Sequence, residues 1–317
     1  MERVLPGIDL AAVPVSGVTR DGQPLSLNRA PAPDLSPWIA RVFVTIVDLP
    51  HGHRIDCGVL SDTAFVRLMF FGKWRAQTAD GEMSYERAAL FFGPQSRLMP
   101  VSVEGPFAMM GFGLRPGACH ALGGFNVAEL VDRIVDLGNI APLRRLLDLE
   151  DVVLQRPEEA LLRLEERLRS VIAERGAVLP DAIVAQFDRA AFAHPTLTIG
   201  DFANEIGIDR RRLERLIRRD FGMSPKQVLR RARVLDMASH LRGVADDAEG
   251  EALALRYYDQ SHMIRDFQHF IGQSPMQFMA RPQPILTLSL ETRQARRLEE
   301  LGRLFPGTRR PWEIQAG

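Results

Sequence analysis

The stretch that decides the fold of the C-terminal half is TIGDFANEIGIDRRRLERLIRRDFGMSPKQVLRRAR, residues 198–233. Its first apolar residues recur at the spacing of a short amphipathic helix and are Ile199, Phe202, Ala203 and Ile206. Thr198 and Asp201 form a pair typical of a helix start, and Gly207 is suited to the left-handed turn that ends a helix. Asp209 then caps a second helix. The stretch therefore predicts two short helices joined by a tight turn, a helix-turn-helix.

The outer face of the second helix carries an excess of positive charge. At 100° per residue, Arg211, Arg215 and Arg218 lie opposite the apolar residues of the same helix. Residues 209–233 contain ten Lys or Arg against three Asp or Glu, a local charge of +7 in a chain whose formal net charge is zero. The alternative is a solvated helix face, but such a face normally mixes both signs. Because an arginine fork donates two parallel hydrogen bonds to phosphate or guanine, the pattern predicts double-stranded DNA as the partner.

The composition of the whole chain is that of ordinary globular protein. Its 317 residues, 46% of them hydrophobic, are enough for two or three domains. Cys57 and Cys119 are too few for a disulfide framework, which favours a reducing compartment. The first residues lack a basic and apolar leader, and no run approaches the roughly 18 apolar residues of a membrane helix. We therefore expect a cytoplasmic protein with no membrane partner.

The first half of the chain reads as β-structure after an irregular start. Residues 1–36 are rich in Pro, Gly and Ala without periodicity, which predicts a flexible N-terminal arm. Apolar residues then alternate from Trp38, and further strand-like runs follow at 64–71, 87–92, 97–103 and 107–114. Turn residues between them predict a small antiparallel barrel or sandwich within a β-rich domain at 37–150. Apolar residues that can line or fill its interior are Phe65, Leu68, Phe70, Leu90, Phe92, Met109, Met110 and Phe112. A filled core is favoured over a ligand cavity, because no convergent set of polar residues indicates a ligand.

Helical patterns follow the β-rich part. Asn126 and Glu129 predict a helix start that leads through Val135. Residues 157–175 begin with proline and keep leucines on one side, within a helical linker at 151–179. A stripe this short favours packing within the chain over a dimer seam. Residues 180–193 form one more amphipathic helix before the helix-turn-helix.

The helix-turn-helix pattern occurs twice. A shift of 50 residues aligns seven identical residues across 23 positions, and these pairs are Asp209 with Asp259, Arg215 with Arg265, Gly222 with Gly272, Ser224 with Ser274, Pro225 with Pro275, Gln227 with Gln277 and Arg231 with Arg281. Between the copies a long helix starts at Ser224 and ends at Gly243. Two units on one stiff helix can place their recognition helices in successive major-groove segments, about 34 Å apart. The second recognition helix starts at Gln260 and carries less positive charge, so we expect the first to supply most of the affinity.

These residues resemble the AraC family of bacterial transcriptional regulators. The matching residues of the first unit are Ala203, Gly207-Ile208-Asp209, Leu213-Glu214-Arg215 and Phe221-Gly222-Met223-Ser224-Pro225. Those of the second unit are Tyr257-Tyr258-Asp259-Gln260-Ser261-His262, Arg265-Asp266-Phe267 and Phe270-Ile271-Gly272-Gln273-Ser274-Pro275. The first half is similar to the N-terminal domain of one subgroup, in Gly93-Pro94-Gln95, Phe112-Gly113-Leu114-Arg115-Pro116-Gly117 and Leu130-Val131-Asp132-Arg133.

The resemblance implies an α+β multidomain chain. Its N-terminal part would be a cupin-like antiparallel β-barrel with a helical extension, and residues 180–281 an all-α DNA-binding domain of two helix-turn-helix units joined by a long helix. The family's base-contacting positions correspond to Arg211, Glu214, Arg215, Gln260, Ser261, Ile264 and Arg265. The helical wheel adds Arg218, and phosphate contacts are predicted for Arg210, Arg219 and Lys226.

The resemblance also implies further partners and one departure. The partners are a small-molecule effector, a second copy of the chain and, for an activator, RNA polymerase. The second unit has Arg256 at a turn where the family usually has glycine. If that turn needs a positive φ, arginine costs on the order of 1 kcal/mol. Alternatively, the turn has a different backbone conformation, or Arg256 contacts a phosphate of the DNA. No role is predicted for the extension at 282–317, which looks helical at 291–304 and has basic residues at Arg293, Arg296, Arg297 and Arg303.

A few residues suggest enzyme chemistry. His51 and His53 form the HxH pair that metal-binding cupins use, so the alternative function is a metal-cupin enzyme with an attached DNA-binding module. Pro50 and Gly52 indicate a turn, however, and no well-spaced Glu or third His follows. Cys57 lacks flanking basic residues that would lower the pKa of its thiol. We therefore expect no catalytic residue, no cofactor and no metal.

Overall fold

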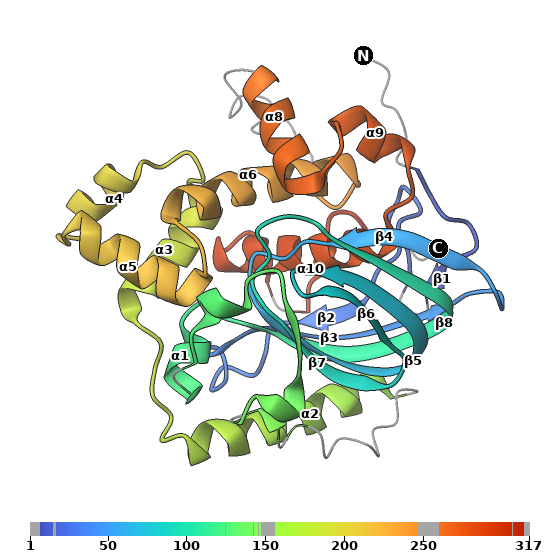
Figure 1. Cartoon of the computed structure of the whole chain (residues 1–317), viewed down its shortest axis with the longest axis horizontal. Coiled ribbons are helices and arrows are strands. Elements are labelled where there is room, and N and C mark those ends of the chain that lie inside the picture. The colour runs from blue at the N-terminus through green and yellow to red at the C-terminus, as the bar shows by residue number, and fades with distance from the viewer. Residues whose placement is uncertain are drawn as a thin grey trace.

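The computed structural model describes residues 7–14, 17–123, 125–141, 143–144, 146, 156–245, 260–305 and 307–313. In this part of the chain, the N-terminal half forms one antiparallel sheet (Figure 1). Its strands are β1 (Val13–Pro14), β2 (Leu27–Arg29), β3 (Ile39–Asp48), β4 (Arg54–Val59), β5 (Phe65–Thr78), β6 (Gly81–Tyr85), β7 (Ala88–Phe92), β8 (Met99–Leu114) and β9 (Ile134–Asp136).

The sheet is built around β8, which pairs with β3, β4 and β5. The strand order β1-β3-β8-β5-β7-β9 does not return to its first strand, so the sheet is curved and barrel-like without closing. β5 bends near Gly72, because its register with β8 shifts on both sides of Phe71 and Gly72 has a φ of +104°. The predicted antiparallel β-domain is confirmed in this open form.

The two faces of the sheet bury different clusters. We call the face of the sheet that packs against α2 (Pro157–Glu174) the outer face and the opposite face the inner face. α2 begins at the predicted proline. The leucine face of α2 is therefore covered by the sheet. Of the residues predicted for the interior, those that lie in the inner cluster are Phe65, Leu90, Phe92 and Met109. Those that pack on the outer side with α2 instead are Leu68, Phe70, Met110 and Phe112. The prediction was wrong for this second set because successive side chains of a strand alternate between faces.

The C-terminal half is helical, as predicted. Its helices are α3 (Ala182–Ala193), α4 (Ile199–Glu205), α5 (Arg210–Phe221), α6 (Pro225–Leu241), α8 (Gln260–Ile271), α9 (Pro275–Ala280) and α10 (Pro284–Glu300). The predicted caps at Thr198, Asp209 and Ser224 each accept a hydrogen bond from the backbone N–H three residues later. These bonds satisfy donors that the first helical turn leaves free. Gly207 and Gly243 have positive φ where the predicted helices end.

The segment between the sheet and α2 differs from the prediction. It contains α1 (Ala118–Gly123) and two 3-10 turns, η1 (Val127–Leu130) and η2 (Leu137–Asn139). Asn126 does cap η1, but the expected helix through Val135 is wrong. Asp132 has a φ of +57°, and the chain then pairs as β9 with β7. Pairing with the open edge of the sheet overrides the local helical pattern.

The flexible arm predicted at the N-terminus is wrong for residues 17–36. β2 pairs with β3 over Leu27–Arg29. Leu25 is buried in the cluster that contains α10, and Leu35 is buried in the outer cluster. A three-residue strand is too short to produce a visible period, which is why composition alone suggested an arm.

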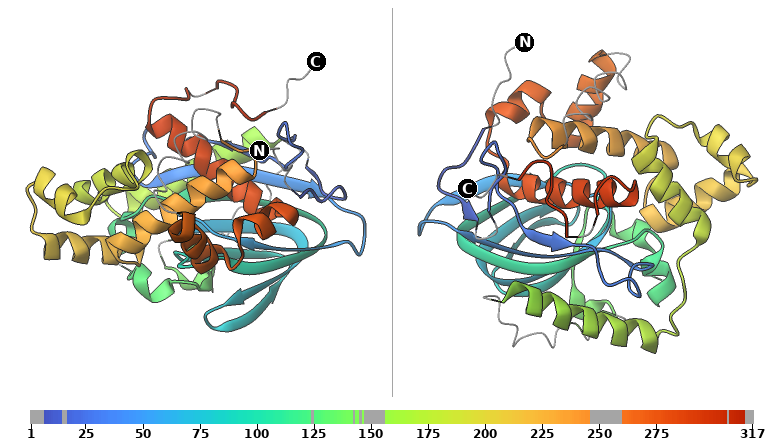
Figure 2. Two further views of the ribbon diagram at one scale, coloured as in Figure 1. Left: turned by 90° about the horizontal axis from the view of Figure 1, so that it is seen from above. Right: turned by 180° about the vertical axis from the view of Figure 1, so that it is seen from behind.

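α10 fills the space between the sheet and α6 (Figures 1 and 2). Its Leu286, Leu290 and Leu298 share one buried cluster with Leu25 of the N-terminal half and Leu235 of α6. The core is therefore continuous between the two halves of the chain. None of the helices that the structure describes is long and apolar enough to span a membrane.

Candidate DNA-binding surface

α5 presents its predicted basic face to solvent. Leu213 and Ile217 are fully buried on its inner side, in a cluster shared with α3 and α4. Phe187 of α3 anchors this cluster through edge-to-face contact with the ring of Phe221, at a centroid distance of 5.6 Å. With the inner side fixed, Arg211, Arg215 and Arg218 project from the opposite, exposed side. The structure thus brings the predicted residues of this helix together on one face.

The charges on this face differ in how freely they can reach a ligand. Arg210 is 68% exposed, and its Nε donates to Oε1 of Glu214 at 3.1 Å. A surface pair of this kind contributes only a few tenths of a kcal/mol, so it opens readily for a competing partner. Within the described ranges, the cations on this side that are exposed and have no ion pair with another described residue are Arg211, Arg212, Arg215, Arg218 and Lys226.

A groove of about 520 Å³ runs between α5 and the start of α6. Its charged lining residues are Arg210, Glu214, Arg218, Lys226, Arg230 and Arg233. Arg230 and Arg233 both pair with Asp266, and the remaining excess of cations gives the groove a positive potential. Such a groove suits the phosphate backbone of a duplex whose bases face α5.

Four further arginines of the predicted basic stretch have protein partners, among them Arg230 and Arg233, which both pair with Asp266. Arg231 is 1% exposed, and its guanidinium donates at 2.7 Å to the backbone carbonyls of Gln95 and Asp62 in the N-terminal half. Arg219 donates to both carboxylate oxygens of Asp220, each at 2.7 Å. The phosphate contact predicted for Arg219 has no support in this geometry. The charge available to DNA is therefore smaller than the sequence count of +7.

The second recognition helix, α8, is also open to solvent. Ser261 and Arg265 are exposed, and Ile264 is 40% exposed. Phe267 is buried on the inner side against the ring of Phe278, with centroids 5.2 Å apart. α8 begins at Gln260, but the side chain of Gln260 lies outside the described residues, as do Arg256 and the rest of the turn before it.

The local geometry of the two units confirms the predicted duplication. Gly222 and Gly272 end their recognition helices with φ of +71° and +76°. Each is followed by a serine cap, Ser224 or Ser274, that forms a reciprocal capping box with the glutamine three residues later. Because both copies carry the same glycine and the same serine cap, α6 and α9 follow their recognition helices with the same local geometry.

The two recognition helices do not run parallel. α6 lies between the two units, and in Figure 1 α5 runs across the view whereas α8 runs down it. Helices that are parallel in space stay parallel in any projection. Recognition helices related by one turn of a straight duplex would share a direction. In this structure they do not.

The C-terminal end of α5 rests on the N-terminal half of the chain. It contacts η1 and α1. A Cβ at Gly222 would lie 2.7 Å from Cγ2 of Val131 and 3.3 Å from Cγ of Pro94, so the two surfaces meet closely at this point. The second unit is attached as well, since the backbone N–H of Leu98 donates to the carbonyl of Phe270 at 2.6 Å.

Comparison with known proteins agrees with this geometry. Residues 202–281, which include both recognition helices, match a family described as a helix-turn-helix domain. This part of the chain is a helix-turn-helix domain of the AraC type. Residues 28–136 match a family described as a domain of unknown function (DUF6597). The resemblance stated from the sequence is thus confirmed, and with it a DNA-binding regulator with a separate N-terminal domain. No curated protein sequence matches the chain.

Solved structures of AraC-family regulators resemble this one at low identity. An apo variant of ToxT from Vibrio cholerae aligns over 75% of this chain and 96% of its own, with 12% identity and a TM-score of 0.44. ToxT with an unsaturated fatty acid bound aligns over 75% of this chain and 94% of its own, with 11% identity and a TM-score of 0.42. The AraC-like transcriptional activator CuxR aligns over 61% of this chain and 76% of its own, with 14% identity and a TM-score of 0.27. A likeness at this level identifies no ligand and no target for the chain.

α10 joins the two halves of the chain through buried ion pairs. The guanidinium of Arg293 lies 3.2 Å from Asp62 of the N-terminal half and 2.6 Å from Asp236 of α6. Arg296 pairs with Asp188 of α3. Arg293, Arg296 and Arg297, for which no role was predicted, are therefore interior, whereas Arg303 is exposed. The buried arginines fix α3 and α6 relative to the sheet. Removing one partner of such a pair typically costs about 3–5 kcal/mol.

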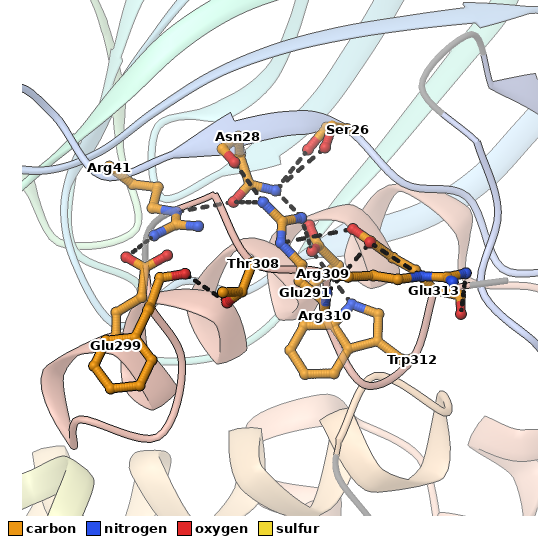
Figure 3. Close-up of polar contacts among 11 residues, drawn as sticks. Ser26, Asn28, Arg41, Glu291, Glu299, Thr308, Arg309, Arg310, Trp312 and Glu313 are labelled. Atoms are coloured by element: carbon orange, nitrogen blue, oxygen red, sulfur yellow. Dashed lines mark hydrogen bonds and ion pairs between the residues drawn. The ribbon is translucent and has the colours of Figure 1, made fainter. Parts of the chain in front are cut away.

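The acidic side of α10 faces the sheet and the C-terminal tail (Figure 3). Glu291 is fully buried, accepts a hydrogen bond from Nδ2 of Asn28 at 2.5 Å and pairs with Arg310 of the tail. Arg41 of β3 pairs with Glu299 at 2.5 Å. The extension is thus an integral layer of the fold.

Among the residues that suggested enzyme chemistry, His53 and Cys57 have structural partners. His51 lies in an exposed turn, and Nε2 of His53 is 2.9 Å from a carboxylate oxygen of Asp9. Burial raises the pKa of the Cys57 and Cys119 thiols, which disfavours the thiolate. Among the described residues no three His, Cys, Asp or Glu are grouped as metal ligands. No observation here favours the metal-cupin enzyme.

Proposed function

We propose that the chain is a sequence-specific transcription regulator in which α5 supplies most of the DNA affinity. The observation that carries this proposal is the row of exposed cations on one face of a firmly anchored recognition helix. α8 carries one arginine, Arg265, and adds sequence preference with less affinity. Phosphate contacts make binding weaken steeply as salt rises.

The roles of the individual residues follow from their positions. Arg211, Glu214 and Arg215 face the base edges, because they lie along the exposed side of α5. Arg210, Arg218 and Lys226 line the groove beside them and contact phosphates. In the second unit the contact positions are Gln260, Ser261, Ile264 and Arg265.

Engagement of both units requires a change in geometry. Because α5 and α8 are not parallel, a straight duplex cannot accept both in successive major-groove segments. Either the DNA bends or one unit rotates relative to the other. We propose that the N-terminal domain controls this step in response to a small molecule, since it touches the end of α5 through η1 and the second unit through Leu98.

A gel-shift series on a selected genomic fragment tests the proposal. Arg215→Ala should lose about 1–3 kcal/mol of binding free energy and relax the preference at one base pair. The matched control is Arg167→Ala on α2, an exposed arginine on the far side of the sheet, which should leave affinity unchanged. Equal affinity and selectivity of the Arg215 variant and the control would contradict the assignment.

A further inference from the structure

A small cavity lies between the inner face of the sheet and α10. Its volume is about 60 Å³. Phe65, Arg67 and Met109 line it from the strands, and Thr292 and Arg293 line it from α10. A single water needs about 10–15 Å³ of such space, so the cavity holds a ligand of only a few non-hydrogen atoms. Drug-sized ligands, which occupy roughly 300–1,000 Å³, are excluded.

Arg67 is the residue in this cavity that lacks a counterion. Its side chain is 4% exposed, and neither Nε nor one terminal nitrogen has a hydrogen-bond partner among the described residues. The guanidinium lies only against aromatic rings, 4.8 Å from the centroid of Phe65 and 5.2 Å from that of Phe92. Burial lowers the pKa of Arg67 to about 10, which still leaves the group charged at neutral pH. A buried charge without a partner is costly, and proteins rarely retain one.

The other three arginines that line the cavity each form an ion pair with a carboxylate, although Nε of Arg293 and two nitrogens of Arg296 have no hydrogen-bond partner among the described residues. Arg41 pairs with Glu299 at 2.5 Å, Arg293 pairs with Asp62 and Asp236, and Arg296 pairs with Asp188. Asp62 is the acidic residue that lines the cavity, and it already faces Arg293. No carboxylate that lines the cavity is therefore free to pair with Arg67.

Two further donors in the same inner cluster are also unsatisfied. The indole N–H of Trp74 and the hydroxyl of Tyr85 have no hydrogen-bond partner in the described structure. Their rings stack with centroids 6.3 Å apart. The charge of Arg67 acts on the Tyr85 hydroxyl, opposing the rise in its pKa that burial causes. The unpaired charge of Arg67 thus calls for an acceptor that carries negative charge.

We propose that this cavity is a binding site for a small oxyanion, held by Arg67. Arg67 lines the cavity, and an oxygen of the anion accepts a hydrogen bond from its guanidinium. The apolar walls formed by Phe65 and Met109 favour a short-chain monocarboxylate over inorganic phosphate. The anion site is separate from the proposed DNA-binding surface, and its test does not depend on whether the chain binds DNA.

Thermal unfolding of the full-length protein tests the site. The protein is dialysed into chloride buffer and titrated with sodium acetate, sodium pyruvate or inorganic phosphate, with sodium chloride added to hold the ionic strength constant. At a hundredfold excess over Kd we expect the Tm to rise by several degrees, and to keep rising with the logarithm of the anion concentration. A rise with the carboxylates assigns a monocarboxylate, and a rise with phosphate alone assigns an inorganic oxyanion.

Two variants on β5 separate the site from general salt effects. Arg67→Met should abolish the rise, and without added anion it should melt no lower than the wild type, because it removes an uncompensated buried charge. Arg75→Met is the matched control, since Arg75 is exposed on the same strand, and it should keep the full rise. Calorimetric titration of the wild type gives a readout that does not depend on a stable variant. Absence of saturable binding of all three anions, or an undiminished rise in Arg67→Met, overturns the proposal.

Discussion

Alanine at Gly222 and at Gly272 provides a matched test of the contact between α5 and the N-terminal domain. The two glycines occupy the same position in their repeats and have φ of +71° and +76°, so each alanine carries the same backbone cost of about 1 kcal/mol. Only the methyl at Gly222 meets another part of the molecule, 2.7 Å from Cγ2 of Val131, whereas nothing lies within 4 Å at Gly272. Valine is stiff at χ1, so the neighbour cannot simply turn away.

Overpacking of this kind costs about 1–3 kcal/mol beyond the backbone term. We therefore expect Gly222→Ala to lower the free energy of unfolding by roughly 2–4 kcal/mol and Gly272→Ala by about 1 kcal/mol. Urea unfolding followed by circular dichroism measures both, with the same dependence on urea for the two variants. Equal losses at the two positions would refute the reasoning, because they would show that α5 does not rest on the N-terminal domain.

Three further predictions concern the ion pairs, the DNA-facing charge and the thiols. Asp236→Ala should lower the free energy of unfolding by about 3 kcal/mol, because Arg293 loses a buried partner. Glu205→Ala, at an exposed position of α4, should change it by no more than about 0.5 kcal/mol. Similar losses in the two variants would argue against a buried ion pair. Lys226→Ala should weaken binding to all sequences alike and reduce the salt slope of log K by about 1, and an effect confined to one base pair would speak against a phosphate contact. Cys119 is 6% exposed and burial raises its pKa, so a thiol reagent at pH 8 should label it only as fast as the protein unfolds.

The helix-turn-helix could be predicted because its signals are local. Thr198, Asp209 and Ser224 act on backbone groups three residues away, and the apolar period is visible within one helix. The duplication could be predicted for the same reason, since each copy carries its own glycine and serine cap. Exposure of the arginines on α5 followed directly from that period.

The role of α10 could not be predicted, because it depends on partners far away in the sequence. Arg293 meets Asp236 across 57 residues, and Arg296 meets Asp188 across 108. Arginines on a helix ordinarily indicate a solvated face, and only the fold reveals the carboxylates that make their burial possible. Arg231 was counted in the positive charge of residues 209–233, although in the structure it donates to backbone carbonyls of the N-terminal half. No periodic signal distinguishes a buried arginine from an exposed one.

Hydroxyl-radical footprinting on a selected genomic fragment tests the central claim most directly, namely that two units on one chain read adjacent turns of a duplex. The account predicts two protected patches about 10 base pairs apart on one face of the DNA. Arg211→Ala should erase the patch under α5 and leave the one under α8 weakened but in place. A single patch, or protection that random competitor DNA removes, would contradict the claim.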